Sequence, residues 1–257
     1  RVFRVRFGGK IREIWDNGRL EIAYDNCEEI EAVPYDMMIS GADSEGVSQL
    51  RLWKARDISH FNMGLFSQGE YSRALEPSVN AEIICKVLYP SDNHYEGKLL
   101  RLTQQYFLVS ASCQNIIRDH IAVYGSLDNF CEKVAIHIND THPALCIPEL
   151  MRIFLDEYSY SWEAAWDMVK RTVTYTNHTV LPEALETWNE DLLALRLPRI
   201  HQILKELNER FCKEMWEYFP GDWNRISEMA ILSGGTVRMA NLAVIASAKV
   251  NGVSKIH

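Results

Sequence analysis

The stretch "KVAIHINDTHPAL", residues 133–145, places a short β-rich run directly before a polar turn and a proline. Two helical segments follow, at 143–157 and 162–169, and then a second β-rich run, "TVTYT", at 172–176. The order strand–helix–helix–strand predicts a parallel α/β layer. In such layers ligands bind beyond the carboxyl ends of the strands, so the polar turn around Asp140 is a candidate site.

The second β-rich run ends in the same way as the first. In "YTNHTVLPEALE", residues 175–186, Asn177 and His178 lie at the strand end, and Pro182 with Glu183 marks a predicted helix start. If the two strands are neighbours, both turns contribute to one polar pocket. Asn, Asp, His and Glu offer donors and acceptors without a basic cluster, which suits a hydroxyl-rich ligand. The residues alone weigh this pocket equally against two plain helix caps.

The first turn has two further interpretations. A metal site would need His137, Asp140 and His142 to converge, but His137 lies inside the strand and His142 lies past the turn. A helix cap needs only one side chain of residues 139–141 to accept a helix N–H, with Pro143 at the first helical position. The cap would still leave Asp140 and His142 able to contact a ligand.

The remaining sequence divides by character. Residues 1–55 read as a β-rich, mostly antiparallel section, in which Asn17-Gly18 predicts a hairpin turn. Residues 56–257 read as helices with short parallel strands, including a long helix that ends near Gly125. Pro77 is expected to start or kink a helix, and Asp222 to cap a helix that runs to about 232. A last helix is expected over 236–249. Another helix is expected over 191–218, and its core side consists of Leu195, Ile200, Ile203, Leu204, Leu207 and Phe211.

Composition excludes several classes of protein. The 257 residues include 27 basic and 35 acidic side chains, a net charge of −8. Without a basic patch or a long apolar run, we expect no nucleic-acid or membrane partner. None of the six cysteines forms a C-x-x-C pair and four lie in apolar runs, which predicts buried free thiols and a cytoplasmic location. Because both ends look cut, we expect a piece of a longer protein.

Together these stretches resemble the glycogen/starch/maltodextrin (α-glucan) phosphorylase family. The resemblance covers nearly the whole chain in order, and its most specific blocks are "NDTHPAL" with "PELMR" and "YTNHTVLPEALE". The other matching stretches are "RLWKA" (51–55), "VLYPSDNHYEGKLLRLTQQYF" (87–107), "LPRIHQIL" (197–204), "FPGD" (219–222) and "VNGVSKIH" (250–257).

This resemblance implies an α/β fold, as part of the Rossmann-like, glycosyltransferase-B type N-terminal domain of a longer enzyme. Such enzymes transfer the terminal glucosyl unit of an α-1,4-glucan to phosphate and release glucose 1-phosphate. Pyridoxal phosphate would be held by a lysine of the C-terminal domain, which this chain lacks. We therefore expect the chain alone to be inactive and to bind no cofactor. A homodimer is also implied, with a contact helix near 70–88.

The resemblance assigns site residues at three places. Asp92, Asn93 and His94 match a gate loop that contacts glucose, and Arg101 lies just beyond it. The family usually has Phe or Tyr stacking where His94 stands, which puts the gate's contribution to acceptor binding in doubt.

At the two turns, Asn139, Asp140 and His142 match residues that border the catalytic and acceptor-sugar sites. His178 matches a histidine beside the glucosyl unit, and Glu183 a carboxylate that lines the glucan channel. The resemblance thus implies catalytic roles for Asp140 and His178 and substrate binding for the others. Two rival functions are a metal-dependent hydrolase that uses His137, Asp140 and His142, and a non-catalytic glycan-binding module.

Overall fold

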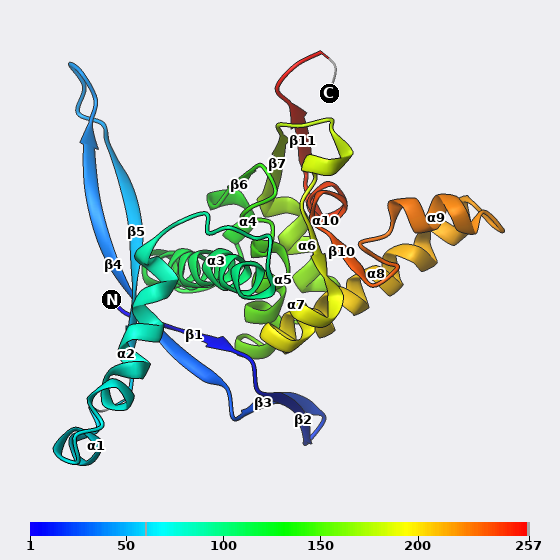
Figure 1. Ribbon diagram of the computed structural model, residues 1–257. Helices are drawn as coiled ribbons and strands as arrows, with labels where there is room; N and C mark the ends of the chain where they lie inside the picture. The colour runs from blue at the N-terminus through cyan, green and yellow to red at the C-terminus, as the bar shows by residue number, and fades with distance from the viewer. Residues whose placement is uncertain (60, 256–257) are drawn as a thin grey trace. The chain divides into compact units, whose positions relative to one another are not determined.

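A computed structural model describes residues 1–59 and 61–255. It is a mixed α/β structure with several separate sheets, and the final two residues of the "VNGVSKIH" motif lie outside the described residues. The chain divides into two compact units. The first unit contains residues 1–7 and 28–111, and the second contains residues 8–27 and those from 112 onward. Figure 1 labels the elements of both units.

The first unit is built on an antiparallel sheet in the order β1-β4-β5. Its strands are β1 (Phe3–Phe7), β4 (Glu28–Ser40) and β5 (Val47–Asp57). Alternate side chains of β1 are buried, as the period of two along a strand requires. The Phe3 ring meets Trp53 of β5 edge to face, with centroids 5.6 Å apart. The β-rich, mostly antiparallel character predicted for the start of the chain is confirmed.

Helices complete the first unit. They are α1 (Met63–Ser67), α2 (Tyr71–Lys86) and the beginning of α3 (Tyr95–Tyr124), which continues into the second unit. Pro77 lies inside α2, so of its two expected roles the helix start is wrong and the kink stays a prediction. The end of α3 was predicted correctly, because Gly125 adopts φ +79° and its N–H donates to the carbonyl of Ile121.

Beyond β1, strands β4 and β5 continue as a two-stranded ribbon (Figure 1). An ion pair crosses the ribbon, because Arg51 Nε and Nη2 donate to the two carboxylate oxygens of Asp36 at 2.6 and 2.8 Å. Hydrogen bonding to Arg51, with a further contribution from Gln49, lowers the pKa of the Asp36 carboxyl to about 2.

We expect this ion pair to be visible in an acid titration. A depressed carboxyl pKa adds stability that is present above the ordinary value near 3.8 and is lost as the pH falls through about 2. Side-chain carboxyl NMR of Asp36 should therefore titrate near pH 2, and in Arg51→Gln its midpoint should return toward the ordinary range. An unchanged midpoint in the variant would contradict the pairing.

The second unit holds three further sheets. Strands β2 (Lys10–Asp16) and β3 (Arg19–Asp25) form the predicted hairpin, whose turn residues Asn17 and Gly18 have φ values of 49° and 81°. A parallel sheet in the order β11-β7-β6 is formed by β6 (Ile136–Asn139), β7 (Val173–Asn177) and β11 (Lys249–Gly252). A small antiparallel sheet in the order β8-β10-β9 is formed by β8 (Thr187–Asn189), β9 (Leu232–Ser233) and β10 (Thr236–Arg238).

Helices surround the parallel sheet, and most were predicted with shifted ends. They are α4 (Phe130–Lys133), α5 (Cys146–Arg152), the π-helical turn η1 (Ile153–Glu157), α6 (Trp162–Thr172), the 3-10 turn η2 (Pro182–Ala184), α7 (Glu190–Arg196), α8 (Pro198–Tyr218), α9 (Trp223–Met229) and α10 (Met239–Ala246). None of the described helices is both long and apolar enough to cross a membrane.

Several boundaries were predicted wrongly. The helix expected over 191–218 is broken at Leu197 before Pro198, and Leu195 is 65% exposed rather than on the core side. The last helix ends at Ala246, because residues 249–252 pair as β11 alongside β7. The predicted cap at Asp222 is confirmed, since its Oδ1 accepts the N–H of Arg225 at 3.1 Å.

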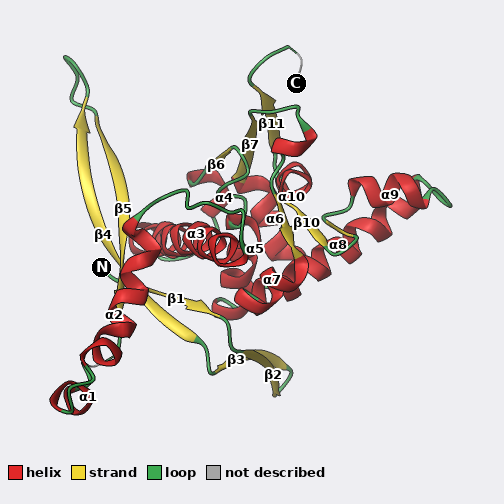
Figure 2. Ribbon diagram, in the orientation of Figure 1, coloured by secondary structure: helices red, strands yellow, loops and turns green. Residues whose placement is uncertain are grey.

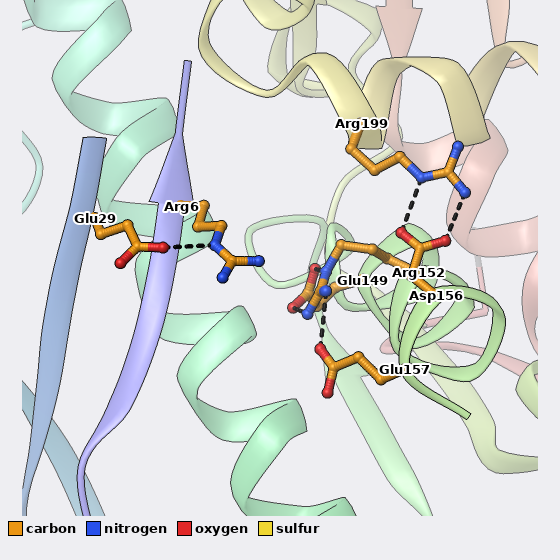
Figure 3. Close-up of polar contacts among 7 residues, drawn as sticks. All are labelled: Arg6, Glu29, Glu149, Arg152, Asp156, Glu157 and Arg199. Atoms are coloured by element: carbon orange, nitrogen blue, oxygen red, sulfur yellow. Dashed lines mark hydrogen bonds and ion pairs between the residues drawn. The ribbon is translucent and has the colours of Figure 1, made fainter. Parts of the chain in front are cut away.

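Buried ion pairs tie α5 and η1 to their neighbours (Figure 3). Arg152 donates two hydrogen bonds of 2.8 Å to the fully buried Glu149 and one of 2.9 Å to Glu157. Arg199 of α8 likewise donates two hydrogen bonds to the carboxylate of Asp156 in η1, from Nε to Oδ2 at 2.9 Å and from Nη2 to Oδ1 at 2.6 Å. Because α5 follows the first polar turn directly, these pairs also fix the position of that turn.

Replacing Arg152 should therefore destabilise the chain strongly. In Arg152→Met the cation that holds the buried Glu149 is lost, and breaking a buried pair from one side costs about 3–5 kcal/mol. Chemical denaturation followed by circular dichroism measures this loss. The matched control is Arg171→Met. Arg171 pairs with Asp167 at the surface, where solvent screens the ion pair, so this variant should leave stability nearly unchanged. Equal losses of stability in Arg152→Met and Arg171→Met would contradict the assignment of Arg152 and Glu149 as a stabilising buried ion pair.

Candidate functional site

Parallel pairing of β6 with β7 brings the two polar turns together. Asn139 at the end of β6 is in register with Thr176 of β7, and the Asp140 N–H donates to the Thr176 carbonyl at 3.0 Å. Figure 2 shows β6, β7 and β11 side by side in this sheet. The two strands are neighbours, which is the condition that the predicted pocket required, and their carboxyl ends form a single polar corner.

A direct side-chain contact joins the two turns. His178 Nε2 lies 2.6 Å from Asn139 Oδ1. With that oxygen facing the ring, Nε2 carries a proton and donates the hydrogen bond. His178 and Asn139 are both exposed, so a ligand can reach them.

Asp140 occupies an uncommon backbone conformation. Its φ is +65°, in the left-handed region that Asp and Asn tolerate better than other side chains. Its Oδ1 accepts the N–H of Thr141 at 2.6 Å and the Thr141 hydroxyl at 3.4 Å. Among the described residues, every hydrogen bond to this carboxylate uses Oδ1, so Oδ2 is the oxygen that can face a ligand.

The helix-cap interpretation of both turns was wrong. Helix α5 begins at Cys146, three residues later than expected, and its N-cap Leu145 offers no side-chain hydrogen bond. After the second strand, Pro182 and Glu183 form only the 3-10 turn η2, which also lacks a side-chain cap. The polar side chains of the two turns therefore do not serve as caps for these elements.

His137 bridges two threonines of β7 on the exposed face of the sheet. Its Nδ1 lies 2.9 Å from Thr174 Oγ1 and its Nε2 lies 2.8 Å from Thr176 Oγ1. Both ring nitrogens are thus engaged by hydroxyl groups. The described residues contain no group of three His, Cys, Asp or Glu side chains arranged to hold a metal ion. The convergence that a hydrolase based on His137, Asp140 and His142 would need is absent from the described chain.

The buried Tyr175 stabilises the second turn through hydrogen bonds. Tyr175 donates from its hydroxyl to Asn177 Oδ1 at 3.1 Å, and Asn177 Nδ2 in turn donates to the Thr179 carbonyl at 2.7 Å. Burial, assisted by the nearby negative charge of Asp140, raises the pKa of Tyr175 to about 12. The phenol therefore stays protonated at neutral pH and holds the loop that carries His178.

Two other predicted site residues of the second unit, His142 and Glu183, lie close in sequence to the residues that form the corner. His142 is half-buried in the turn before α5, and Glu183 is exposed in η2. Their convergence on one ligand with Asn139 and His178 stays a prediction.

The predicted gate segment belongs to the first unit. Arg101 Nη1 donates to Asp92 Oδ2 at 2.9 Å, so the segment is tied back onto α3. His94 Nδ1 accepts the N–H of Gly97 at 3.0 Å, which makes this imidazole the cap of α3. Asn93 is exposed.

Gly97 is required by this arrangement. A Cβ at this position would lie 1.8 Å from the carbonyl oxygen of Ser91, a backbone atom that cannot move aside easily. The gate segment is therefore folded closely against the first turn of α3, and only glycine permits that approach.

The sequence analysis missed part of the corner. Thr174 and the buried Thr176 lie on the same face of β7, and Asn251 of β11 donates to Thr176 Oγ1 at 3.4 Å. The period-two pattern of "TVTYT" contained the signal for the threonines. Asn251 was missed because its segment was assigned to the end of the last helix and the residues after it.

Comparison with known proteins identifies the family of this chain. A family model described as carbohydrate phosphorylase matches residues 1–257. The glycogen phosphorylase of Bacillus subtilis is 47% identical over 98% of this chain, and the muscle form of sheep is 45% identical over 98%. The chain spans 31% of the length of each of these two relatives. The chain belongs to the carbohydrate phosphorylase family.

Proposed function

We propose that this chain forms one wall of the sugar site of an α-1,4-glucan phosphorylase. The observation that carries the proposal is the contact between Asn139 and His178, which unites the two strand ends beside Asp140. The chain's membership of the carbohydrate phosphorylase family and its similarity to relatives named glycogen phosphorylase support the same conclusion.

The corner suits a hydroxyl-rich ligand. Within a few residues it offers an amide, an imidazole and a carboxylate oxygen, each of which bonds readily to sugar hydroxyls. No cation takes part in the hydrogen bonds of the corner among the described residues. The neutral part of the substrate, the glucan, is therefore the ligand for this wall.

The reaction transfers a glucosyl unit between two oxygens. The bond from C1 of the terminal glucose to the oxygen of the neighbouring sugar breaks, and a new bond from C1 to a phosphate oxygen forms. The released sugar oxygen takes up the proton that the phosphate loses and becomes a hydroxyl group. Positive charge develops on the sugar ring as the first bond breaks. A carboxylate at Asp140 stabilises that charge, and His178 and Asn139 orient the ring.

The resemblance assigns further substrate contacts within each unit. In the first unit Asp92, Asn93 and His94 are the proposed gate with Arg101, and in the second unit His142 and Glu183 are proposed to bind the glucan. Because His94 Nδ1 is occupied by the cap of α3, only its ring face and Nε2 can meet a sugar.

Pyridoxal phosphate does not fit the residues of this chain. A lysine that forms a Schiff base reacts as the neutral amine, which burial favours. Every lysine among the described residues is exposed. We therefore place the cofactor in another part of a phosphorylase of full family length, together with the phosphate site.

Six free thiols support a reducing, cytoplasmic location for this protein. Burial raises the pKa of the Cys146 thiol to about 12, so it stays protonated and unreactive at neutral pH.

Helix α2 is the proposed dimer contact. Its side chains Ala74, Ala81 and Ile84 are buried against the unit, while four apolar side chains spaced four residues apart are 42–57% exposed. These are Tyr71, Leu75, Val79 and Ile83. An exposed apolar stripe of this length is typical of a helix that packs against a partner.

Asp140→Asn tests the site. In a phosphorylase of full family length that contains this chain, the amide keeps the left-handed backbone and the bond to Thr141 but removes the charge. We expect kcat and kcat/KM for glucose 1-phosphate formation to fall together by about 100-fold, because the charge acts in the transition state. Val180→Ala, at an exposed position of the neighbouring loop, is the control and should leave both constants unchanged. An Asp140→Asn enzyme with unchanged kcat and kcat/KM would contradict the role of Asp140 in the site.

The cofactor placement has its own test. This chain, mixed with pyridoxal phosphate, should show no Schiff-base absorbance and no phosphorolysis of maltooligosaccharides. A full-length phosphorylase treated in parallel should show both. A stoichiometric imine signal from the chain alone would contradict the placement.

A further inference from the structure

We propose that Asn177 is a positioning residue for the glucosyl transfer, which acts through His178 and holds it in place by a small hydrogen-bond network. This inference rests on the proposed function and deepens it, because it assigns a role to a residue outside the proposed substrate contacts. In the sequence, Asn177 is a candidate ligand contact beside His178. Its hydrogen bonds in the structure give it a different role.

The side chain of Asn177 binds the backbone of Thr179, two residues farther along the chain. Asn177 Nδ2 donates to the Thr179 carbonyl at 2.7 Å, and the Thr179 N–H donates to Asn177 Oδ1 at 3.4 Å. An asparagine that binds the backbone two residues on fixes a turn locally. His178 is the one residue between the two, so this turn restrains its backbone.

The buried core anchors this turn. The Tyr175 hydroxyl donates to Asn177 Oδ1 at 3.1 Å, and Tyr175 is only 1% exposed. Tyr175 lies on β7, the central strand of its sheet, where it pairs with Ile138 of β6 and Val250 of β11. The turn is therefore fixed to a rigid element, which an accurately placed site needs. We call the three hydrogen bonds of the Asn177 side chain the Asn177 network.

The Asn177 network requires an amide at position 177. A carbonyl can only accept and a backbone N–H can only donate, so Nδ2 must face the Thr179 carbonyl and Oδ1 must face the Thr179 N–H. With Oδ1 in this place, the Tyr175 hydroxyl is the donor to Asn177. The three bonds together need one group that both donates and accepts.

The network sets the position of the His178 imidazole. His178 is exposed, yet its Nε2 lies 2.6 Å from Asn139 Oδ1. Among the described residues the His178 backbone makes no hydrogen bond of its own, so the Asn177 network is its local restraint. The network fixes the backbone and Asn139 fixes the side chain. An imidazole that is fixed in advance needs less ordering when the transition state forms.

Tyr175 connects the network to the first turn as well. Burial, and then the negative charge of Asp140, raises the pKa of Tyr175 to about 12, so the hydroxyl keeps its proton and donates at neutral pH. The effect of Asp140 on this phenol shows that the network lies close to the carboxylate of the first turn. A charge introduced at position 177 would therefore act on the same region.

Asn177→Asp tests the network with almost no change of volume. The carboxylate still accepts from Tyr175 and from the Thr179 N–H, but its other oxygen would face the Thr179 carbonyl with no proton between them. In a phosphorylase of full family length that contains this chain, kcat for glucose 1-phosphate formation should fall by about tenfold or more, because the imidazole is displaced. The KM for phosphate should stay within about twofold, because the phosphate site is proposed to lie elsewhere.

Two further variants make this test specific. Tyr175→Phe removes one bond of the network without adding a charge, so kcat should fall by a smaller factor, about threefold to fivefold. Asn224→Asp, at an exposed position of α9, adds the same charge outside the network and should leave both constants unchanged. A slow Asn177→Asp enzyme beside an unaffected Tyr175→Phe enzyme would show an effect of charge alone and would overturn the proposal.

A crystal structure of the Asn177→Asp enzyme gives a readout that does not depend on activity. The separation of His178 Nε2 and Asn139 Oδ1 should increase from 2.6 Å to beyond hydrogen-bonding distance, about 3.5 Å. An unchanged separation would overturn the proposal. An increased separation at an unchanged kcat would also overturn it, because the network would then shape the loop without acting on the reaction.

The Asp140→Asn enzyme separates this inference from the proposed function. If Asp140→Asn is slow while Asn177→Asp keeps the full rate, the inference fails and the proposed function stands. If Asn177→Asp is slow while Asp140→Asn keeps the full rate, the role of Asp140 fails and the Asn177 network stands.

Discussion

The parallel register between β6 and β7 is the constraint on which the site depends. One backbone bond, from the Asp140 N–H to the Thr176 carbonyl, ends the pairing and turns the chain. It forces Asp140 into its left-handed conformation and sets Asn139 opposite the loop that carries His178. A slip of one residue would move every side chain of β6 to the other face and separate the two turns.

Support for that register comes from both sides of the sheet. On the exposed face, His137 holds Thr174 and Thr176 with its two ring nitrogens. In the interior, the pair of Glu149 with Arg152 secures the helix that follows the turn. Polar groups thus specify the position of the corner, while apolar packing supplies the stability of the unit.

Much of this corner could be predicted from the sequence, because periodicity and strand-end polarity are local signals. The two strands and the residues at their ends followed from "VAIHIN" and "TVTYTN", and their parallel order followed from the two helical segments between them. The helix caps were predicted wrongly, because Asp140 bonds to its own neighbour Thr141 instead of a later helix N–H. The partners of β11, of Arg199 and of the outer ribbon are distant in sequence, and no local pattern specifies which segments meet.

The left-handed backbone at Asp140 also limits how this site can change over evolutionary time. Glycine, asparagine and aspartate tolerate a φ of +65°, whereas a β-branched or bulky side chain would meet its own carbonyl oxygen. Of these three residues, only aspartate carries a charge. The fold therefore restricts this position to one carboxylate and two neutral residues. A lineage that loses the negative charge here has few single substitutions that could restore a charge at the same place.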